Sequence, residues 1–367
     1  MRVYYVGAGY DSCYYVRCMV PLQAAGWWGD ITTLRGIRNS PQAAMQGVMN
    51  ADVVVMQRPM QSDHLEIIKT LKQAGKKIVF DNDDTYTKDS GIPKIMNHIP
   101  ELEDKVDALL DKFDGNLKEA AGLCDMVTVT TEFLANEYRP VNPNVVVLPN
   151  CVNPEDWQEP ILNDTGKIRI GISGSVASSR DYEYAKDAII ALSKMDNVQL
   201  VLFGLPPDRP EFAEQRNFFK EDVDWWQNIG AEWYGWVGIE DYQDKLNEMK
   251  LDICLIPRID NYFNRCKSNL KYLEHSMYKI PVIAQGFSTG DSPYQKDIQH
   301  GINGMIAMEP TDWLTMTLEL INNPELRKTI GQNAYDYVVE NYDINKRIGE
   351  WETTYESLLY GTKDQNQ

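Results

Sequence analysis

The 367-residue sequence has little of what marks secreted, membrane-spanning or metal-binding chains. No apolar run reaches the ~18 residues of a transmembrane helix, and the opening segment MRVYYVGAGY predicts a strand and not a signal peptide. The six cysteines form no Cys-x-x-Cys pair, and the four histidines have no metal-ligand spacing. We therefore expect a protein of a reducing, cytoplasmic compartment, without stable membrane insertion, disulfides or zinc.

Positive charge is also scarce, because 36 lysine and arginine residues stand against 54 aspartate and glutamate residues, giving a formal net charge of −18. This balance disfavours a large footprint on nucleic acid or on an anionic membrane, although a local basic cleft is compatible with an acidic exterior. The chain is 43% hydrophobic and 25% charged, which is ordinary for a globular protein with a full-sized core.

Short apolar runs alternate with helical patterns along almost the whole chain. Strands are predicted at 2–7, 51–57, 76–81, 125–131, 144–150, 167–174, 198–204, 231–237, 252–257 and 279–285. Helices are predicted at 64–75, 101–113, 181–194, 240–249, 268–278, 311–321, 324–341 and 343–360. Alternation of helices with strands rich in valine and isoleucine predicts parallel sheets that are covered on both faces.

The length fits two such blocks better than one. A segment rich in Pro, Asn and Asp, residues 150–167, marks the joint between them. We predict an α/β protein of two Rossmann-like, doubly wound domains, residues 1–155 and 156–341, that face each other across a cleft. Residues 342–367 are predicted to form a helix that packs back on the first domain, followed by a tail.

The most informative stretch is NRCKSNLKYLEHSMYKIPVIAQG, residues 264–286, in which a charged cluster precedes an apolar strand. The predicted helix start carries two cations, two polar side chains and, one turn further in, one carboxylate: Lys267, Lys271, Ser268, Asn269 and Glu274. Helix N-termini bind anions because their first N–H groups are unpaired and carry the positive end of the dipole. Ser268 or Asn269 can cap that end.

A nucleotide sugar suits this pattern. Lys267, Arg265 and Arg258 add charge for a diphosphate at the helix start, and Glu274 can accept hydrogen bonds from ribose or sugar hydroxyls. The same lysine–glutamate spacing also fits a solvated helix face held by side-chain pairs, so spacing alone leaves both interpretations open.

The segment FNRCKSNLKYLEHSMYKIPVIAQ resembles the signature helix of retaining glycosyltransferases with the GT-B fold, the large group-one family of the family-four type. There an acid ends the motif and a Gly-x-Pro-Val-Ile strand follows, in the place that residues 278–283 take here. Four further segments agree, namely DMVTVTTEFLANEY, NVVVLPNCVNPEDW, KIRIGISGSVASSRDYEYA and YGWVGIEDYQDKLNEMKLDICLIP. ADVVVMQRP and KKIVFDNDDTY resemble first-domain segments of a sub-branch common in bacteria and their phages.

This resemblance implies a hexosyltransferase-like enzyme that moves a sugar from a UDP- or GDP-sugar to a hydroxyl acceptor with retention of anomeric configuration. It implies an acceptor-side first domain, a nucleotide-sugar-binding second domain, and no required cofactor or metal ion. The acceptor stays open between a glycan, a lipid-linked sugar and a hydroxymethylated base in phage DNA. A non-catalytic nucleotide-sugar-binding protein is a further alternative, because Cys266 replaces the first of the two acids that many members carry.

For such a reaction we expect catalysis from groups that stabilise charge on the departing diphosphate, Lys267 and Arg180, and from Asp83 or Asp84, which would position the acceptor hydroxyl. Backbone N–H groups of Ser268, Asn269 and Leu270 would share the diphosphate. The other substrate-binding candidates are Gly7, Gly9, Arg58, Gly174, Ser175, Trp236, Val237, Arg258, Arg265 and Glu274.

Two short motifs allow alternative interpretations. GAGYDS, residues 7–12, lacks the third glycine of the dinucleotide fingerprint, which disfavours a nicotinamide cofactor; the loop either faces the cleft or makes a simple strand–helix turn. Asp81-Asn82-Asp83 matches the Asp-x-Asp pattern by which another glycosyltransferase fold holds a divalent ion. The predicted two-domain architecture disfavours that fold. An acidic strand end that only caps the next turn fits the sequence as well as a role of Asp83 or Asp84 in positioning the acceptor.

Overall fold

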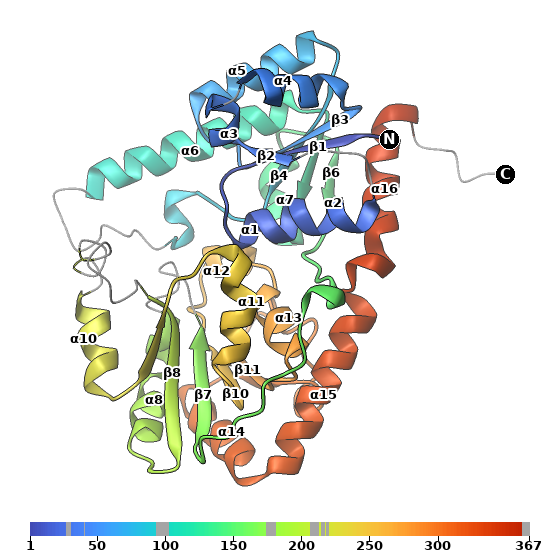
Figure 1. Cartoon of the computed structure of the whole chain (residues 1–367). Helices are drawn as coiled ribbons and strands as arrows, with labels where there is room; N and C mark the ends of the chain where they lie inside the picture. The colour runs from blue at the N-terminus through green and yellow to red at the C-terminus, as the bar shows by residue number, and fades with distance from the viewer. Residues whose placement is uncertain are drawn as a thin grey trace.

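The structure is a computed structural model that describes residues 1–26, 31–39, 41–92, 103–173, 181–205, 213, 217 and 220–361. Two parallel six-stranded sheets form the centres of two stacked domains, blue to green above and green to red below in Figure 1. This arrangement confirms the predicted α/β class with two Rossmann-like domains.

The first sheet has the strand order β2-β1-β3-β4-β5-β6. Its strands are β1 (Val3–Gly7), β2 (Ile31–Thr33), β3 (Val53–Gln57), β4 (Lys77–Asn82), β5 (Met126–Val129) and β6 (Val145–Val147). Every residue of β3 is buried, as expected for a parallel strand covered on both faces.

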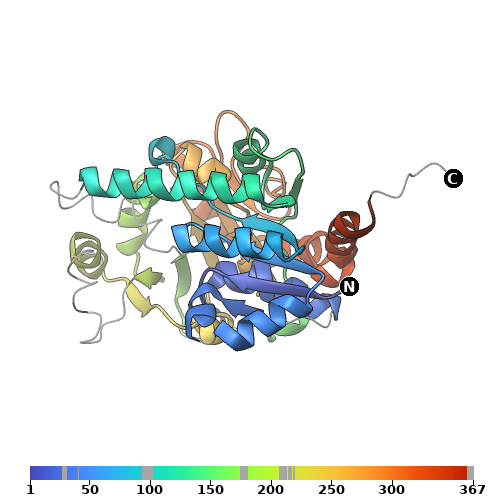
Figure 2. The same cartoon turned by 90° about the horizontal axis from the view of Figure 1, so that it is seen from above.

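Helices cover both faces of this sheet. One face packs against α4 (Pro41–Asn50), α5 (Ser62–Gln73), α6 (Glu103–Leu123) and α7 (Glu132–Tyr138). Of these, α5 and α6 lie side by side, as the view from above shows (Figure 2). The opposite face packs against a continuous helical segment made of α1 (Ser12–Tyr14), the π-helical turn η1 (Tyr15–Met19) and α2 (Val20–Ala25). The short helix α3 (Leu34–Asn39) follows β2.

The second sheet has the order β12-β11-β10-β7-β8-β9. Its strands are β7 (Ile168–Ser173), β8 (Val198–Leu205), β9 (Glu232–Gly235), β10 (Ile253–Ile256), β11 (Val282–Gln285) and β12 (Met305–Ala307). One face packs against α8 (Lys186–Ser193) and α14 (Pro310–Asn322). The other packs against α11 (Ile239–Glu248), α13 (Leu270–Met277) and α15 (Pro324–Asn341). Shorter elements are α10 (Lys220–Asn228), α12 (Tyr262–Cys266), η2 (Lys88–Ser90), η4 (Pro154–Asp156) and η6 (Asp181–Ala185).

The last helix, α16 (Ile344–Tyr360), returns to the first domain, as predicted. Its Trp351 and Tyr355 are buried against Val3 and Tyr5 of β1, and it lies beside the upper domain in Figure 1. The chain segments that lead into and out of the second domain pair with each other here. The N–H of Val152 donates to the carbonyl of Tyr342 (3.0 Å), and the N–H of Ile344 donates to the carbonyl of Val152 (2.9 Å). The division at residues 155 and 341 stays a proposal.

Two of the differences between the predicted and the observed element boundaries have a clear physical cause. The strand predicted from residue 279 begins at Val282, because Lys279 has a φ of 56° and turns the chain after α13 before Pro281. The helix predicted at 101–113 extends to Leu123, because an apolar face continues through Leu117, Ala120 and Ala121 into the core.

Because α15 packs closely against the turn after α13, we expect Gly331 of α15 not to tolerate a larger side chain. A Cβ added at Gly331 would overlap the backbone carbonyl of Lys279. We expect Gly331→Ala to cost about 1–3 kcal/mol of stability, because two backbones must separate, and to lower the melting temperature measured by circular dichroism. Gly349→Ala in α16 is the matched control, since no atom lies within 4 Å of its added Cβ. Equal melting temperatures for the two variants would contradict the packing argument.

Candidate functional site

A cleft of about 490 Å³ lies between the domains, where the carboxyl ends of both sheets meet. Its walls come from loops after β1, β4 and β6 of the first domain, and from β8, the loops after β9 and β10, and α13 of the second. Open α/β sheets bind ligands at this edge because loops and helix N-termini converge there. Several predicted site residues line it: Asp83, Asp84, Trp236, Val237, Arg258, Lys267, Ser268, Leu270 and Glu274.

The first-domain wall carries two adjacent aspartates just after β4, and they have different environments. Asp83 is buried and accepts two hydrogen bonds from Arg58, Nε to Oδ1 at 2.6 Å and Nη2 to Oδ2 at 2.9 Å. Burial alone would raise the pKa of Asp83, but the charge and hydrogen bonds of Arg58 outweigh it and lower that pKa to about 2. Asp83 is therefore a weak base. Arg58, predicted to touch substrate, sits outside the cleft lining and holds Asp83 in place.

Asp84 instead reaches across the cleft. Its Oδ1 lies 2.6 Å from Nζ of Lys267, so this ion pair joins the first domain to the second. The side chains of Asp84 and Lys267 are 18% and 20% exposed. The ammonium also lies 4.2 Å from the ring centroid of Phe263. Lys267, the lysine predicted to bind the diphosphate, thus lies in the cleft and pairs there with a carboxylate from the opposite wall.

The start of α13 differs from the predicted cap. Asn269 takes the N-cap position, but its side chain donates to Asp297 Oδ2 (2.8 Å) and makes no cap hydrogen bond. Ser268 accepts a hydrogen bond from Asn150 Nδ2 (2.9 Å), a residue of the first domain. Ser268 and Leu270 both line the cleft, so the amino end of α13 faces it.

Arg258 lies at the floor of the second-domain wall. It is buried, and its Nη1 lies 2.6 Å from Oδ2 of Asp181. The other carboxylate oxygen of Asp181 accepts hydrogen bonds from Nδ2 of Asn264 (3.0 Å) and from the N–H of Ile259 (3.1 Å). Asp181 therefore holds the guanidinium at the cleft floor, although the two residues are 77 positions apart in the sequence.

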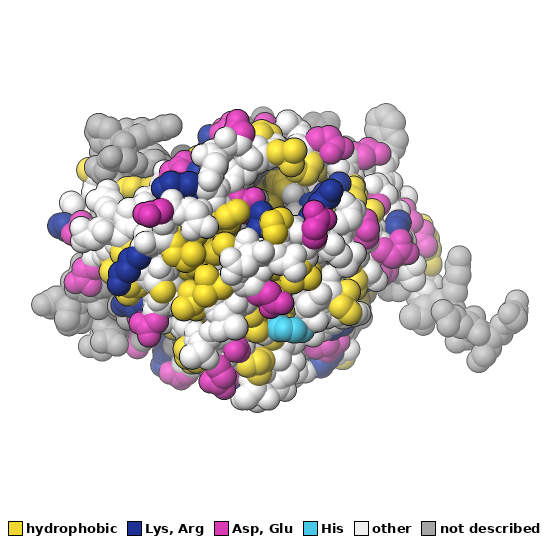
Figure 3. All heavy atoms as spheres, turned by 90° about the horizontal axis from the view of Figure 1, so that it is seen from below, with side chains coloured by type: hydrophobic (Ala, Val, Ile, Leu, Met, Phe, Trp, Pro, Cys, Tyr) yellow, Lys and Arg dark blue, Asp and Glu magenta, His cyan; other side chains and the backbone are white. Residues whose placement is uncertain are grey.

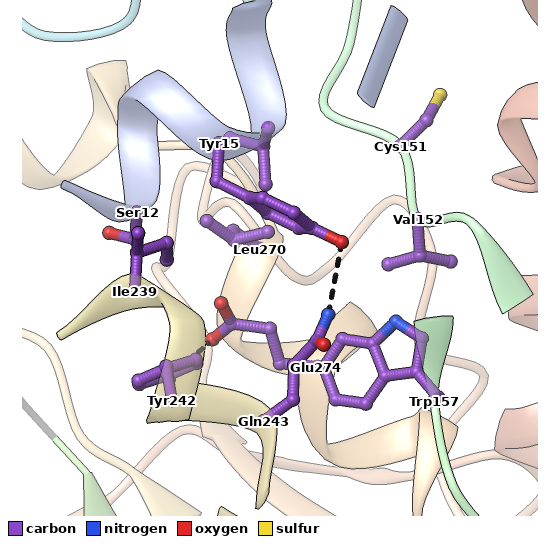
Figure 4. A pocket seen from close by; sticks show the side chains of 11 residues that line it. Ser12, Tyr15, Cys151, Val152, Trp157, Ile239, Tyr242, Gln243, Leu270 and Glu274 are labelled. Carbon is purple, nitrogen blue, oxygen red and sulfur yellow. Dashed lines mark hydrogen bonds between the residues drawn. The ribbon is translucent and has the colours of Figure 1, made fainter. Parts of the chain in front are cut away.

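Glu274 is buried one turn into α13, and Oε2 accepts a hydrogen bond from the hydroxyl of Tyr242 (2.9 Å). Burial raises the pKa of Glu274 to about 7, although the hydrogen bond from Tyr242 and the charge of Lys271 act in the opposite direction. Glu274 and Tyr242 also border a small side cavity of about 10 Å³ toward Tyr15 and Gln243, which hydrogen-bond across the domains at 3.2 Å (Figure 4).

The remaining end of the cleft is apolar. Phe203, Trp236, Val237 and Ile239 line it, and the indole N–H of Trp236 donates to the carbonyl of Gly204 (2.6 Å). The ring of Phe203 stacks on Tyr242 with centroids 5.5 Å apart. A flat, partly apolar ligand group such as a nucleobase fits this end.

Other predicted residues are placed differently. Gly7 is buried, and a Cβ there would overlap the ring of Tyr14, so its lack of a side chain serves internal packing. Gly9 sits outside the cleft lining, which the following residues of the same loop, Tyr10 to Cys13, provide. Arg265 pairs with Asp260 (2.7 Å) and Asp291 (3.6 Å) and also lies outside the lining. Gly174, Ser175 and Arg180 lie outside the described residues.

Sequence reasoning missed several polar residues of this site, among them Asp11 and Ser12. Asn150, Tyr242 and Lys271 line the cleft, and Asp181 holds Arg258 from behind. Of Asn150, Tyr242, Lys271 and Asp181, only Lys271 could be recognised as a candidate from the sequence, because it is the second cation of the charged stretch at residues 264–286. No role was assigned to it from the sequence. Asn150 and Tyr242 lie far from that stretch in sequence and reach it only through the fold.

The carboxylates of the Asp-x-Asp pattern are engaged by arginines. Asp81 pairs with Arg17 through Oδ1 to Nε at 3.0 Å and Oδ2 to Nη2 at 2.5 Å, as Asp83 pairs with Arg58. Within the described ranges, no group of three or more His, Cys, Asp or Glu residues has an arrangement that could hold a metal ion. Among those same residues, none of the helices combines the length and apolar character that crossing a bilayer requires.

Comparison with family models finds no match, and neither does comparison with curated proteins. Solved structures do resemble the chain. Sucrose-phosphate synthase from Thermosynechococcus elongatus is 14% identical, with a TM-score of 0.66 over 98% of this chain and 99% of that one. HepE from Anabaena, in complex with UDP-glucose, is 13% identical, with a TM-score of 0.65 over 96% of this chain and 100% of that one. A glycosyltransferase from Rickettsia africae is 14% identical, with a TM-score of 0.63 over 98% and 99%. At these identities the likeness establishes the fold, which is the GT-B arrangement of two Rossmann-like domains.

Proposed function

We propose that this protein is a glycosyltransferase that moves a sugar from a nucleoside-diphosphate sugar to a hydroxyl acceptor with retention of configuration, as the sequence resemblance implies. One observation carries the proposal: a single interdomain cleft brings together the cations Arg258, Lys267 and Lys271, the carboxylate Glu274 and an apolar end at Trp236. These are the groups that a pyrophosphate, a ribose and a base need. A UDP-sugar is the first donor to test, because the complex of the fold relative HepE holds UDP-glucose.

The donor orientation follows from the positions of these groups. The diphosphate lies against Lys267 and the amino end of α13, the ribose hydroxyls meet Glu274, and the base lies between Trp236 and Val237. Fixed positive groups then stabilise the charge that develops on the departing diphosphate, which is the main source of rate acceleration in such a site. We keep the proposal that Arg180 also stabilises the charge on the departing diphosphate.

Asp84 is the better candidate for positioning the acceptor hydroxyl. Asp83 is held by Arg58 and its pKa of about 2 makes it a poor proton acceptor. Asp84 faces the cleft and pairs with Lys267, so a diphosphate that takes Lys267 frees the carboxylate at the same moment. We propose that the donor binds first and that its binding makes Asp84 available to the acceptor.

The nature of the cleft favours a neutral, polyhydroxylated acceptor, either a glycan or a lipid-linked sugar. The first-domain wall presents the acids Asp11, Asp83 and Asp84, and the chain has a formal net charge of −18. On the face of the molecule in Figure 3, acidic and basic side chains are interspersed, and the coloured residues there form no extended basic surface. A modified DNA base is the less favoured acceptor, because a net charge of −18 disfavours binding of duplex DNA.

A non-catalytic nucleotide-sugar-binding protein is the second candidate, and Cys266 is the observation that favours it. This cysteine, in the place of an acid in the resembling family, is buried in the core beside the first domain, and its carbonyl accepts a hydrogen bond from Thr131 (3.0 Å). It therefore cannot supply the sugar contact that an acid would make.

A donor panel tests the proposal and separates the two candidates. We expect one of UDP-, GDP-, ADP- and CMP-sugars to raise the melting temperature, because a ligand that binds only the folded state stabilises it. The same donor should release free nucleoside diphosphate when glycan, lipid-linked and hydroxymethylated-DNA acceptors are added in turn. Stabilisation without release would favour the binding protein, and stabilisation by none of the four would contradict both candidates.

A further inference from the structure

Lys271 is the one cation of the cleft lining to which the sequence assigns no role. It lies on the first turn of α13 and lines the cleft together with Arg258, Lys267 and Glu274. Its side chain is partly covered, so ligands in the cleft can reach it. Glu274 lies three positions further along the same helix, on the same face.

Charged and titratable groups from several elements act on Lys271. On the second-domain side these are Arg258 after β10, Asp181 of η6, Glu274 and His275 of α13 and Cys254 of β10. Tyr242 of α11 lines the same cleft and hydrogen-bonds to Glu274. Across the cleft are Asp11, Asp83 and Asp84 of the first domain, and Lys267, which pairs with Asp84, lies on the same side as Lys271. The two largest charge effects on Lys271 oppose each other, since Arg258 repels an ammonium and Glu274 attracts one.

Burial and the charge of Arg258 lower the pKa of Lys271 to about 7, against the attraction of Glu274. Burial raises the pKa of Glu274 to about 7 as well. Near neutral pH the pair therefore changes its protonation state with little free energy. Below this range it carries a protonated lysine and a neutral acid, and above it a neutral lysine and a carboxylate.

We propose that Lys271 is a donor-binding residue that contacts the diphosphate, and that donor binding draws a proton from solvent onto the Lys271–Glu274 pair. This inference rests on the proposed function, which places the diphosphate in the same cleft.

The physical reason is charge compensation. A diphosphate with two negative charges favours the ammonium form of a neighbouring lysine and the neutral form of a neighbouring acid. Both changes consume protons, so binding must strengthen at lower pH. For one proton taken up, the dissociation constant rises about tenfold for each pH unit above neutrality.

The test is titration calorimetry with UDP-glucose, whose pyrophosphate carries no second titrating proton over roughly pH 6 to pH 9. Heats measured at about pH 7.5 in buffers of low and high ionisation enthalpy give the number of protons taken up. Because both groups have a pKa of about 7, we expect the wild-type protein to take up about one to two protons. Lys271→Met should bind about 10–100-fold more weakly, because a hydrogen bond to a charged group is lost, and should take up fewer protons.

Lys271→Arg separates a proton-binding role of Lys271 from a merely structural one. A guanidinium stays protonated at every accessible pH, so this variant should still bind UDP-glucose while proton uptake falls. Lys245→Met, on the exposed side of α11, is the control and should leave both quantities unchanged. The melting temperature of each variant without ligand reports whether it is folded.

The outcomes separate this inference from the proposed function. Saturable binding of UDP-glucose with the same heat in both buffers, or wild-type affinity in Lys271→Met, overturns the role of Lys271 and leaves the donor site standing. Absence of binding by UDP-glucose and by the GDP-, ADP- and CMP-sugars overturns both.

Discussion

Replacing Lys267 by alanine is expected to reduce turnover about 10²–10³-fold while the protein stays folded, because one fixed charge on the departing diphosphate is lost. The residue is partly exposed in the cleft and outside the buried core, so its removal leaves the packing of α13 intact. The measurement is release of free nucleoside diphosphate from the donor found in the panel, with circular dichroism as the check on folding. Lys245→Ala on the exposed face of α11 is the control and should retain full activity.

The partner of Lys267 gives an independent test of the same site. Asp84→Asn removes the carboxylate that competes with the diphosphate, so this variant should bind donor more tightly than the wild type and yet turn over more slowly. Lys267→Ala should instead weaken donor binding. Near-normal turnover in Lys267→Ala, or weaker donor binding in Asp84→Asn, would contradict the placement of the diphosphate.

The largest expected effect on stability comes from the buried ion pair between Arg17 and Asp81. Their side chains are 1% and 3% exposed, and Arg17 also donates to the carbonyl of Leu148 (2.6 Å) while Asp81 accepts from Thr128 Oγ1 (2.7 Å). Removing one partner leaves a buried charge uncompensated, which costs about 3–5 kcal/mol. We expect Asp81→Asn to lower the melting temperature strongly, as measured by scanning calorimetry.

Lys69→Ala is the control for this substitution. Lys69 pairs with Glu66 on the exposed face of α5, where such pairs contribute less than about 1 kcal/mol. The comparison also tests the alternative interpretation of Asp81-Asn82-Asp83 as a metal site. A variant Asp81→Asn that keeps wild-type stability but loses metal-dependent activity would show that the carboxylate holds an ion and not Arg17.

Most of the fold could be predicted because parallel strands leave a clear pattern. Strands covered on both faces are continuous apolar runs, and β3 and β10, each buried along its full length, were predicted within two residues. The helical segment over residues 12–25 was missed. It packs between β1 and α16, so apolar residues occupy several of its sides and its periodicity is weak. Strands β2 and β12 were also missed, because ITT and MIA do not stand out as apolar runs, whereas the equally short β6 is the run VVV.

The candidate site was predicted where it is local in sequence. Lys267, Ser268, Leu270 and Glu274 share one helix start and meet in one cleft. The pairing of arginines with acids could not be predicted, because a sequence does not say which acid each arginine meets. Arg58 and Asp83 are 25 positions apart, and nothing in the sequence around either residue indicates that the two will pair. Burial, which gives Glu274 its raised pKa, likewise becomes known only with the fold.

The paired chain crossings have a mechanical consequence. Val152 and the segment from Tyr342 to Ile344 are hydrogen-bonded to each other at the point where the chain passes between the domains, so the domains are tied together twice at one place. We therefore expect any opening of the domains to be a rotation about this point and not a sliding movement. Such a rotation would part the contact between Lys267 and Asp84, and closing would bring that lysine back to the same carboxylate.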